Sequence, residues 1–515
     1  MTIKLPLAKS VTANPTQDEL KAMVAQMSNA QLTEFGNWHV KARVTARSGG
    51  STFIVSDDPG RTSKKTMSRV DYEAAAAKQN AYIAGCDMIL VEGYIGPENS
   101  PMRVPARVYI ERSNANIPAM QQQLYYAKDS GWREEDAFTV IYTPNLRAEG
   151  YPDQRLIAID LEHWVTRVFN ADYFGESKMG GLRMWNEWVY ERGGLAMHAG
   201  AKVIPTSGGD KVVLIVGLSG TGKTTTTFTR QNNSLPVQDD FIALMPGGDV
   251  YSSEDGCFAK TFGLDPNKEP TIYDALTTPH GWLENVAVDE NGKVDFFDAS
   301  YTANGRGTFE LCMIEHYDPR KLGRADFLLI LNRNDTIVPA VAKMASKEQA
   351  VAYFMLGETK GTSAGGAHEA GKSLRVPGTN PFFMQFDSMQ GNRLGDLIDS
   401  MDYDFQVYLL STGRIGGGED VTGSKKVQIQ HTSAVVKAIA EDTISWETDP
   451  DFGYLAATSV PGFDDIELLA PRRLYERLGR EEEYRQSVER LKAERSAYMQ
   501  KHSGLEQAYV EALKG

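Results

Sequence analysis

The chain has 515 residues, of which 41% are hydrophobic and 24% are charged, a composition typical of a folded globular protein. This length exceeds one ordinary hydrophobic core and predicts two or three domains. The formal net charge of -14 at pH 7 argues against a nucleic-acid-binding surface, which needs a broad positive field. An anionic ligand would therefore have to be bound by a local group of cations.

Targeting and redox signals favour a cytoplasmic protein. The stretch MTIKLPLAKSVTANP at the start lacks an apolar signal core, and the sequence contains no run of about eighteen apolar residues. Cys86, Cys257 and Cys312 are scattered without C-x-x-C spacing, which predicts neither a disulfide framework nor a zinc site. We expect no membrane partner, and the composition leaves the number of subunits open.

Helical and strand patterns are mixed in the N-terminal part. Residues 16–29 carry apolar residues at helical spacing, whereas residues 87–94 and 106–110 have the pattern of short strands. A turn at residues 207–210 precedes another apolar strand, which suggests a boundary near residue 205. We therefore expect an N-terminal substrate-binding domain over 1–205 and a C-terminal mononucleotide-binding domain over 206–515.

A phosphate-binding loop follows that apolar strand. Residues 217–224, GLSGTGKT, match G-x-x-x-x-G-K-[ST], whose glycines let backbone N–H groups face a polyphosphate at the start of a helix. Lys223 is expected to bridge the terminal phosphates, and the Thr224 hydroxyl to reach a magnesium ion. Asp239 and Asp240 follow at a distance suited to holding that metal.

The rest of the chain predicts an α/β core with a loop and a charged C-terminal helix. Residues 327–331 and 405–410 read as strands separated by segments with helical spacing. Residues 361–373, rich in Gly, Ala and Ser, predict a mobile lid. The run REEEYRQSVERLKAER in the C-terminal region predicts a solvated surface helix.

In its phosphate loop and in several further blocks, the chain resembles the ATP-dependent phosphoenolpyruvate carboxykinase family. The phosphate loop is identical to that of the family, and TARSGGSTFIVSDD, YFGESKMGGLRMWNEW, GLAMHAGAKV, EDGCFAKTFGL, LENVAVDENGKVDF and TANGRGTFEL resemble family blocks in the same order. The resemblance implies a two-domain α/β fold with a P-loop mononucleotide-binding domain and a deep interdomain cleft. It also implies a role in gluconeogenesis, with oxaloacetate and ATP converted to phosphoenolpyruvate, carbon dioxide and ADP.

The resemblance assigns site residues position by position. Arg47 and Tyr173 stand where the family binds the substrate carboxylate and carbon dioxide, Lys178 stands at a catalytic lysine, and Arg306 contacts substrate and the transferred phosphoryl group. The implied metal ligands are His198, Asp240 and Thr224. The implied nucleotide-binding positions are Gly217, Leu218, Ser219, Gly220, Thr221, Gly222, Lys223, Thr224, Lys426 and Thr432. Fixed arginines, a lysine and a divalent metal suit this chemistry, because an enolate must be stabilised until it attacks the γ-phosphoryl group.

Three positions depart from the family pattern. Met179 replaces the second lysine of Y-G-G-E-x-K-K-G, and a thioether is a poor ligand for Mg²⁺ or Mn²⁺. The carboxylate motif reads QDDFI instead of GDDEH, and Lys426 replaces an arginine that would stack on the base. The cofactors implied are ATP with Mg²⁺, and Mn²⁺ at a second metal position that Met179 alters.

Three functions fit these residues. The leading hypothesis is ATP-dependent carboxykinase chemistry on oxaloacetate or, in reverse, on phosphoenolpyruvate. A divergent phosphotransferase that acts on another small carboxylate is the second, suggested by Met179 beside an intact phosphate loop. The third is a nucleotide-binding homologue without catalysis, which would bind nucleotide but not turn it over under any metal condition.

Overall fold

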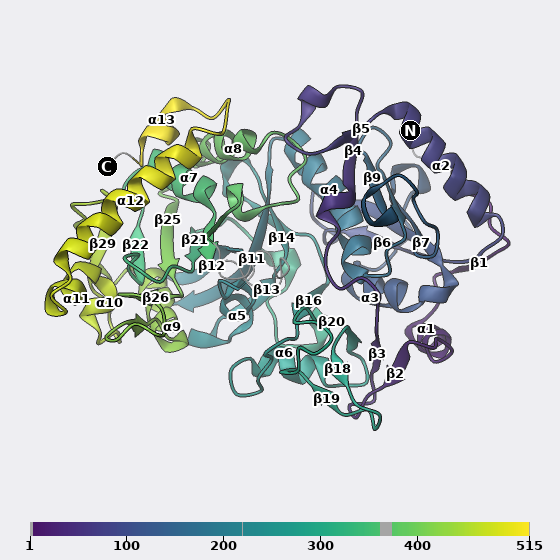
Figure 1. The fold of residues 1–515 in the computed structure, drawn as a ribbon, viewed down its shortest axis with the longest axis horizontal. Coiled ribbons are helices and arrows are strands. Elements are labelled where there is room, and N and C mark those ends of the chain that lie inside the picture. Colours follow the sequence, from purple (N-terminus) through teal and green to yellow (C-terminus); the bar gives the residue numbers. More distant parts are fainter. Residues whose placement is uncertain (1–3, 219, 361–372, 514–515) are drawn as a thin grey trace. The chain divides into compact units, whose positions relative to one another are not determined.

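The computed structural model describes residues 4–218, 220–360 and 373–513 as two compact units (Figure 1). The first unit comprises residues 1–192, 251–320 and 382–386, and the second comprises 193–250, 321–381 and 387–515. Contacts therefore divide the chain differently from the two contiguous segments expected to meet near residue 205. Residues 251–320 return to the first unit because strands β16 and β20 join a sheet with strands from residues 30–40. The expected lid at 361–373 falls outside the described residues except for Ser373.

The α/β class is confirmed, since each unit combines helices with a mixed sheet. The helices are α1 (Gln17–Val24), α2 (Arg69–Ile83), α3 (Asn116–Leu124), α4 (Phe174–Glu191), α5 (Lys223–Phe228), α6 (Pro270–Leu276), α7 (Lys347–Leu356), α8 (Asp387–Asp399), α9 (Ile429–Ala440), α10 (Ile466–Leu469), α11 (Pro471–Arg477), α12 (Glu481–Met499) and α13 (Gln507–Glu511). None of the described helices has the length and apolar character needed to cross a membrane.

The first unit contains two large sheets and the short hairpin of β18 (Ala287–Val288) and β19 (Val294–Asp295). The larger has the order β1 (Ser10–Ala13), β6 (Asp87–Ile95), β7 (Val104–Glu111), β8 (Phe138–Thr143), β10 (Val165–Phe169), β9 (Leu156–Asp160), β4 (Thr52–Val55) and β5 (Thr66–Met67). The smaller has the order β16 (Gly256–Lys260), β20 (Arg306–Glu310), β17 (Trp282–Glu284), β3 (Trp38–Val40) and β2 (Ala30–Leu32). Helix α4 packs against β8 and β10, which buries most of its residues and fixes its first turn.

The second unit is built on one sheet. Its order includes β14 (Phe241–Leu244), β11 (Leu195–Thr206), β12 (Gly209–Val216), β21 (Phe327–Asn332), β25 (Gln406–Ser411), β22 (Val341–Lys343), β29 (Leu455–Ser459) and β28 (Ser445–Thr448). Strand β13 (Leu235–Gln238) also pairs with β11. Because β12, β21 and β25 are parallel, their carboxyl ends meet at one edge of the sheet.

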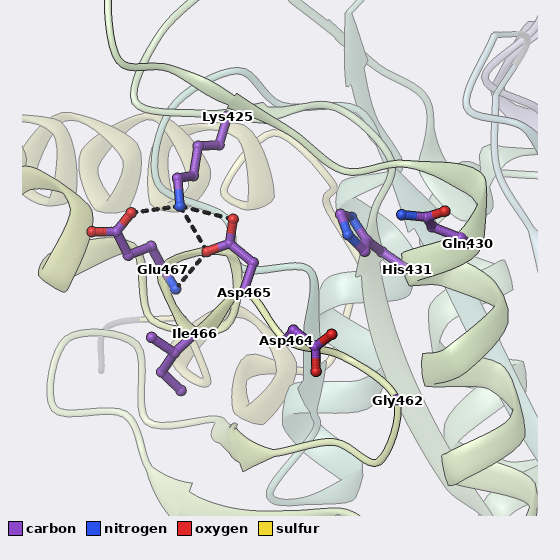
Figure 2. Close-up of a pocket in the computed structure, with 8 residues that line it drawn as sticks. All are labelled: Lys425, Gln430, His431, Gly462, Asp464, Asp465, Ile466 and Glu467. Atoms are coloured by element: carbon purple, nitrogen blue, oxygen red, sulfur yellow. Dashed lines mark hydrogen bonds and ion pairs between the residues drawn. The ribbon is translucent and has the colours of Figure 1, made fainter.

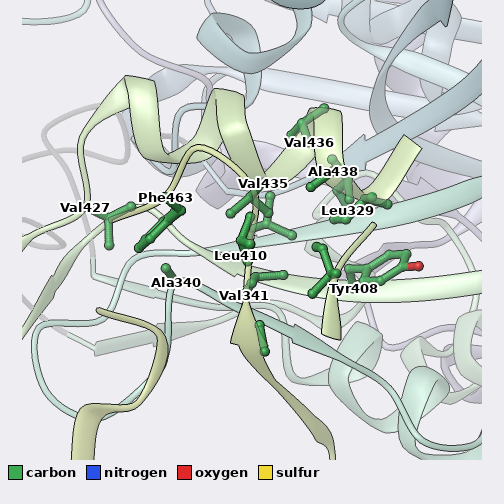
Figure 3. Close-up of a cluster of buried hydrophobic side chains, with 14 of the residues drawn as sticks. Leu329, Ala340, Val341, Tyr408, Leu410, Val427, Val435, Val436, Ala438 and Phe463 are labelled. Atoms are coloured by element: carbon green, nitrogen blue, oxygen red, sulfur yellow. The ribbon is translucent and has the colours of Figure 1, made fainter. Parts of the chain in front are cut away.

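One hydrophobic cluster of the second unit lies between this sheet and α9. Figure 3 shows Leu329 and Leu410 from the parallel strands beside Val435 and Val436 from the helix. All four side chains are at most 1% exposed, so α9 is fixed on the sheet by apolar burial.

The predicted strands are confirmed at 87–94, 106–110, 327–331 and 405–410, where β6, β7, β21 and β25 lie. The helix predicted over 16–29 is shorter, since α1 spans Gln17–Val24 and begins at the capping box of Thr16 and Glu19. The C-terminal helix α12 exposes many of its residues, as expected of a solvated surface helix. It buries one face, including Val488, Leu491 and Arg495.

Arg495 on α12 forms a buried ion cluster with a short hairpin. Its guanidinium donates to Glu358 at 2.7 Å, and Arg375 donates to the same carboxylate at 2.9 Å. Glu358 and Arg375 are cross-strand partners in β23 (Glu358–Lys360) and β24 (Ser373–Arg375). Burial would raise the pKa of Glu358, but the charges of Arg495 and Arg375 outweigh it and lower that pKa.

We predict that Glu358→Gln lowers the free energy of unfolding by about 3 kcal/mol, because it leaves a buried guanidinium without its carboxylate. The urea midpoint followed by circular dichroism measures this loss. The matched control is Asp399→Asn, which removes an exposed partner of Lys347 from the same unit and should cost less than about 1 kcal/mol. Equal shifts for the two variants would contradict the role assigned to the buried cluster.

Candidate active site

The phosphate loop connects β12 to α5, as the motif requires. Gly220 and Gly222 have φ angles of 86° and 90°, in the region that favours glycine. A Cβ at Gly217 would lie 2.4 Å from Thr221 Oγ1, so this glycine is required for the tight turn. Ser219, one of the predicted nucleotide-binding residues, lies outside the described residues.

The predicted Asp-Asp pair contacts the phosphate loop through Asp239 and His198 through Asp240. Lys223 Nζ donates to the backbone carbonyl of Asp239 at 2.6 Å, and the Thr224 hydroxyl donates to the Asp239 carboxylate. Asp240 instead lies 3.1 Å from Nε2 of His198. Asp239 therefore organises the phosphate loop, and Asp240 faces the histidine predicted to bind metal.

Pairing around β11 explains this arrangement. Strands β13 and β14 both pair with β11, so the two residues that link them, Asp239 and Asp240, are held beside this strand. His198 lies on β11 opposite Phe241. At Gly200 a Cβ would lie 2.0 Å from Thr227 Oγ1 and 3.1 Å from Asp239 Oδ1. A side chain at this position would displace α5 and the carboxylate together.

His198 and Asp240 have the chemistry of a divalent-metal site. His198 Nδ1 lies 2.9 Å from the carbonyl oxygen of Thr379, so a neutral imidazole donates there and presents the lone pair of Nε2 to Asp240. Burial, followed by the charge of Lys223, lowers the pKa of His198 and favours the neutral form. Either a proton on Nε2 or a bound cation would bridge the two groups at 3.1 Å, and nitrogen and oxygen donors suit Mg²⁺ or Mn²⁺.

The remaining nucleotide-binding predictions lie at the start of α9. Lys426 ends strand β27 (Lys425–Lys426), and Thr432 is in the first turn of the helix. The neighbouring Ser433 accepts a hydrogen bond from Asn232, which follows α5. This contact connects the predicted base region with the helix that carries Lys223.

A cavity of about 720 Å³ adjoins this region, and its lysine is already neutralised. Figure 2 shows the Lys425 ammonium between the carboxylates of Asp465 and Glu467, which lie 2.8 and 2.6 Å from its Nζ. The exposed Asp464 adds a further negative charge to the lining. The cavity is therefore a poor site for phosphate, and Lys426 is the better placed of the two lysines for an anionic ligand.

The first unit gathers predicted cations around the Phe258 ring. The ring centroid lies 5.4 Å from Lys178 Nζ and 5.2 Å from Arg306 Cζ. Tyr173 contacts the same ring at 6.3 Å between centroids and is also hydrogen-bonded to Arg306. Lys178 donates to buried Glu254 at 2.8 Å, a pair that fixes the lysine in its position.

Arg47 is connected to the same region by two short links. Asn304 accepts a hydrogen bond from Arg306 at 2.9 Å and donates to the carbonyl of Thr45, two residues before Arg47. On the other side, the N–H of Ser48 donates to Glu176 in the first turn of α4. The structure thus gathers Tyr173, Lys178 and Arg306 around Phe258 and connects the backbone on both sides of Arg47 to this region, while the Arg47 guanidinium lies 5.5 Å from the Phe382 ring centroid.

Electrostatics keep this group cationic. Burial raises the pKa of Glu284, whose carboxylate accepts from the N–H of Phe174, to about 8, so it is mostly neutral at pH 7. Burial also raises the pKa of Tyr173, which keeps the phenol protonated. Arg306 Nε is buried with no hydrogen-bond partner among the described residues, as expected of a donor that a ligand would satisfy.

Sequence reasoning missed two lysines. Lys260 pairs directly with Arg306 across β16 and β20, and burial followed by the arginine charge lowers its pKa to about 8. Lys202 is fully buried on β11 and donates to the carbonyl of Thr226 near the end of α5 at 2.8 Å. Its place in the apolar run AGAKVIP was a possible signal, because a charged side chain in such a strand needs a specific partner.

A phosphate loop after a parallel strand, together with a histidine–carboxylate pair, is typical of nucleotide-dependent phosphotransferases. The family pattern described as Phosphoenolpyruvate carboxykinase matches residues 9–466. The chain therefore belongs to the phosphoenolpyruvate carboxykinase family.

Individual relatives agree with this assignment. The chain is 29% identical over 476 residues to Phosphoenolpyruvate carboxykinase (ATP) of Alkaliphilus oremlandii, covering 87% of this chain and 86% of the relative. It is also 29% identical to the proteins of the same name from Chelativorans sp., covering 92% and 89%, and from Bacillus velezensis, covering 90% of each.

We predict that Lys202→Met stabilises the protein at pH 7 and that the gain shrinks as pH rises. Burial lowers the pKa of Lys202 from 10.5 to about 8, so between these values the unfolded chain holds a proton that the folded chain lacks. Wild-type stability therefore rises with pH across this window, whereas the variant lacks this contribution. The difference at pH 7 should approach about 3 kcal/mol.

Urea unfolding of both proteins between pH 7 and 10 measures this difference. Lys202→Gln, which keeps a donor without a charge, should follow Lys202→Met. If the difference in the free energy of unfolding between wild type and variant stays constant over the whole pH range, burial does not lower the pKa of Lys202.

Proposed function

We propose that this protein catalyses the ATP-dependent conversion of oxaloacetate to phosphoenolpyruvate, carbon dioxide and ADP. The observation that carries the proposal is the cationic group around Phe258, in a chain of this family that also has an intact phosphate loop. Oxaloacetate carries two carboxylates, and its enolate adds a developing negative charge. Several fixed cations in one place are the physical requirement for both.

The residues of the first unit suit binding and decarboxylation. Arg306 and Arg47 offer planar donor forks to carboxylate and phosphoryl oxygens. Lys178, fixed by Glu254, offers ammonium donors, and Lys260 supplies further positive charge for the enolate. Tyr173 keeps its proton and offers a neutral hydrogen-bond donor beside Arg306.

The residues of the second unit suit the triphosphate. Lys223 and the backbone of the phosphate loop would hold the terminal phosphates, while Lys426 and Thr432 would lie near the base. His198 and Asp240 would hold a divalent ion, with Thr224 nearby through Asp239. When bound, such an ion supplies charge neutralisation on phosphate and enolate oxygens.

One observation favours a second candidate function. Met179, in the first half of α4, is 8% exposed and occupies the family's second lysine position. A site with one amine fewer would suit phosphotransfer to another small carboxylate without decarboxylation. ATP turnover with such an acid, and no phosphoenolpyruvate from oxaloacetate, would favour this candidate.

The proposal predicts that Lys223→Ala lowers kcat for phosphoenolpyruvate formation by about a hundredfold or more, since the positive charge that stabilises the transferred phosphoryl group is lost. A coupled assay with oxaloacetate, ATP and Mg²⁺ or Mn²⁺ measures it. Lys211→Ala, near the opposite end of β12, is the matched control and should retain activity. Undiminished turnover in Lys223→Ala would overturn the assigned role.

A further prediction concerns Met179. Met179→Lys should lower the Mn²⁺ concentration needed for half-maximal activity by about tenfold, because an amine is a better ligand than a thioether. Met179→Leu removes the sulfur without adding an amine and should leave the Mn²⁺ titration unchanged. Direct Mn²⁺ binding followed by electron paramagnetic resonance gives a second readout, and identical curves for all three proteins would place residue 179 away from the metal.

A further inference from the structure

We infer that Thr412 and Arg333 are positioning residues that hold the phosphate loop from its outer side. Neither belongs to the loop motif, since Arg333 is 113 residues from its contact and Thr412 is 191 residues from its own. The inference rests on the proposed nucleotide-binding function and concerns how this chain sets the affinity of that site.

Thr412 makes the stronger of the two contacts. It follows the last residue of β25, and its hydroxyl donates to the carbonyl of Thr221 at 2.7 Å. Its own N–H donates to the carbonyl of Asn332 at the end of β21, at 2.8 Å. The hydroxyl is therefore presented to the loop by a backbone already bonded to the neighbouring strand.

Arg333 makes the second contact, one residue after β21 ends. Its Nη1 donates to the carbonyl of Gly220 at 3.1 Å, which is the only hydrogen bond of this side chain to another described residue. No carboxylate among the described residues pairs with this exposed guanidinium. Its positive charge is therefore retained beside a loop that would bind an anion.

The carboxyl end of β21, beside Arg333 and Thr412, is held in place by its own packing and hydrogen bonds. A Cβ added to Gly217 would lie 3.0 Å from Leu331 Cβ, so β21 and the loop pack closely together. Asn332 is 2% exposed, and its amide donates at 3.4 Å to Glu358 of the buried cluster with Arg495. Movement of the loop relative to β21 would break these contacts.

Peptide geometry connects the outer contacts to phosphate binding. In a trans peptide the carbonyl of one residue and the N–H of the next point in opposite directions. Holding the Thr221 carbonyl toward Thr412 therefore turns the N–H of Gly222 to the other side of the loop. Oriented N–H groups are what a phosphate loop offers its ligand.

The decisive experiment compares Thr412→Val, which removes the hydroxyl at nearly constant shape, with Thr412→Ser, which keeps it. ATP binding to the full-length protein is measured by titration calorimetry with Mg²⁺, alongside the KM for ATP and for oxaloacetate. We expect Thr412→Val to weaken ATP binding by about tenfold and to raise KM for ATP but not for oxaloacetate. Thr412→Ser should bind like the wild type.

Two matched controls separate positioning from general destabilisation. Thr458→Val removes a threonine hydroxyl that donates to the carbonyl of Ser445 in the same unit, and should not change ATP affinity. Arg333→Met should weaken ATP binding by about threefold or more, whereas Arg485→Met, which removes the same charge from α12, should not.

The outcomes are distinct. Unchanged ATP affinity in Thr412→Val, or equal weakening in Thr412→Ser or Thr458→Val, would overturn the inference. If Thr412→Val does not fold, wild-type affinity in Arg333→Met would overturn it instead. A wild-type protein that binds no ATP at all would refute the proposed function. Tight ATP binding that none of the variants alters would refute only the inference about Thr412 and Arg333.

Discussion

The second unit depends above all on the contact between Asp239 and the start of α5. Lys223 and Thr224 both bond to this residue, which is held beside β11 by the pairing of β13 and β14. Because Gly200 has no side chain, the start of α5 and the Asp239 carboxylate can approach β11 closely. Because His198 lies on the same strand and Asp240 follows Asp239, one strand arranges both the phosphate loop and the pair suited to metal. A displacement of β11 would disturb both together.

The first unit holds several cations close together and compensates only some of them. Glu254 compensates Lys178 in a buried pair, and the Phe258 ring offers its face to both Lys178 and Arg306. Glu284 could neutralise the arginine, but burial keeps it mostly protonated at pH 7. The group therefore keeps a net positive charge for a dicarboxylate, although the whole chain carries a formal charge of -14.

Local patterns predicted the parts of the fold that depend on neighbouring residues. The phosphate loop, β6, β21 and β25 follow from short apolar runs and glycine spacing. Burial of Arg495 could not be predicted this way, because it requires Glu358, 137 residues distant. Lys260 was missed for the same reason, since only the register of β16 and β20 places it beside Arg306. The return of residues 251–320 to the first unit likewise depends on long-range strand pairing.

The pair of His198 and Asp240 lies within the second unit and does not include Met179. The imidazole presents one lone pair to the Asp240 carboxylate at 3.1 Å while its other nitrogen is committed to Thr379, and burial disfavours protonation of the ring. Such a pair is stable only with a bound ion or a proton between its members. Under the proposed function, a metal ion at this pair would keep the nitrogen and oxygen donors of His198 and Asp240 whatever side chain stands at position 179.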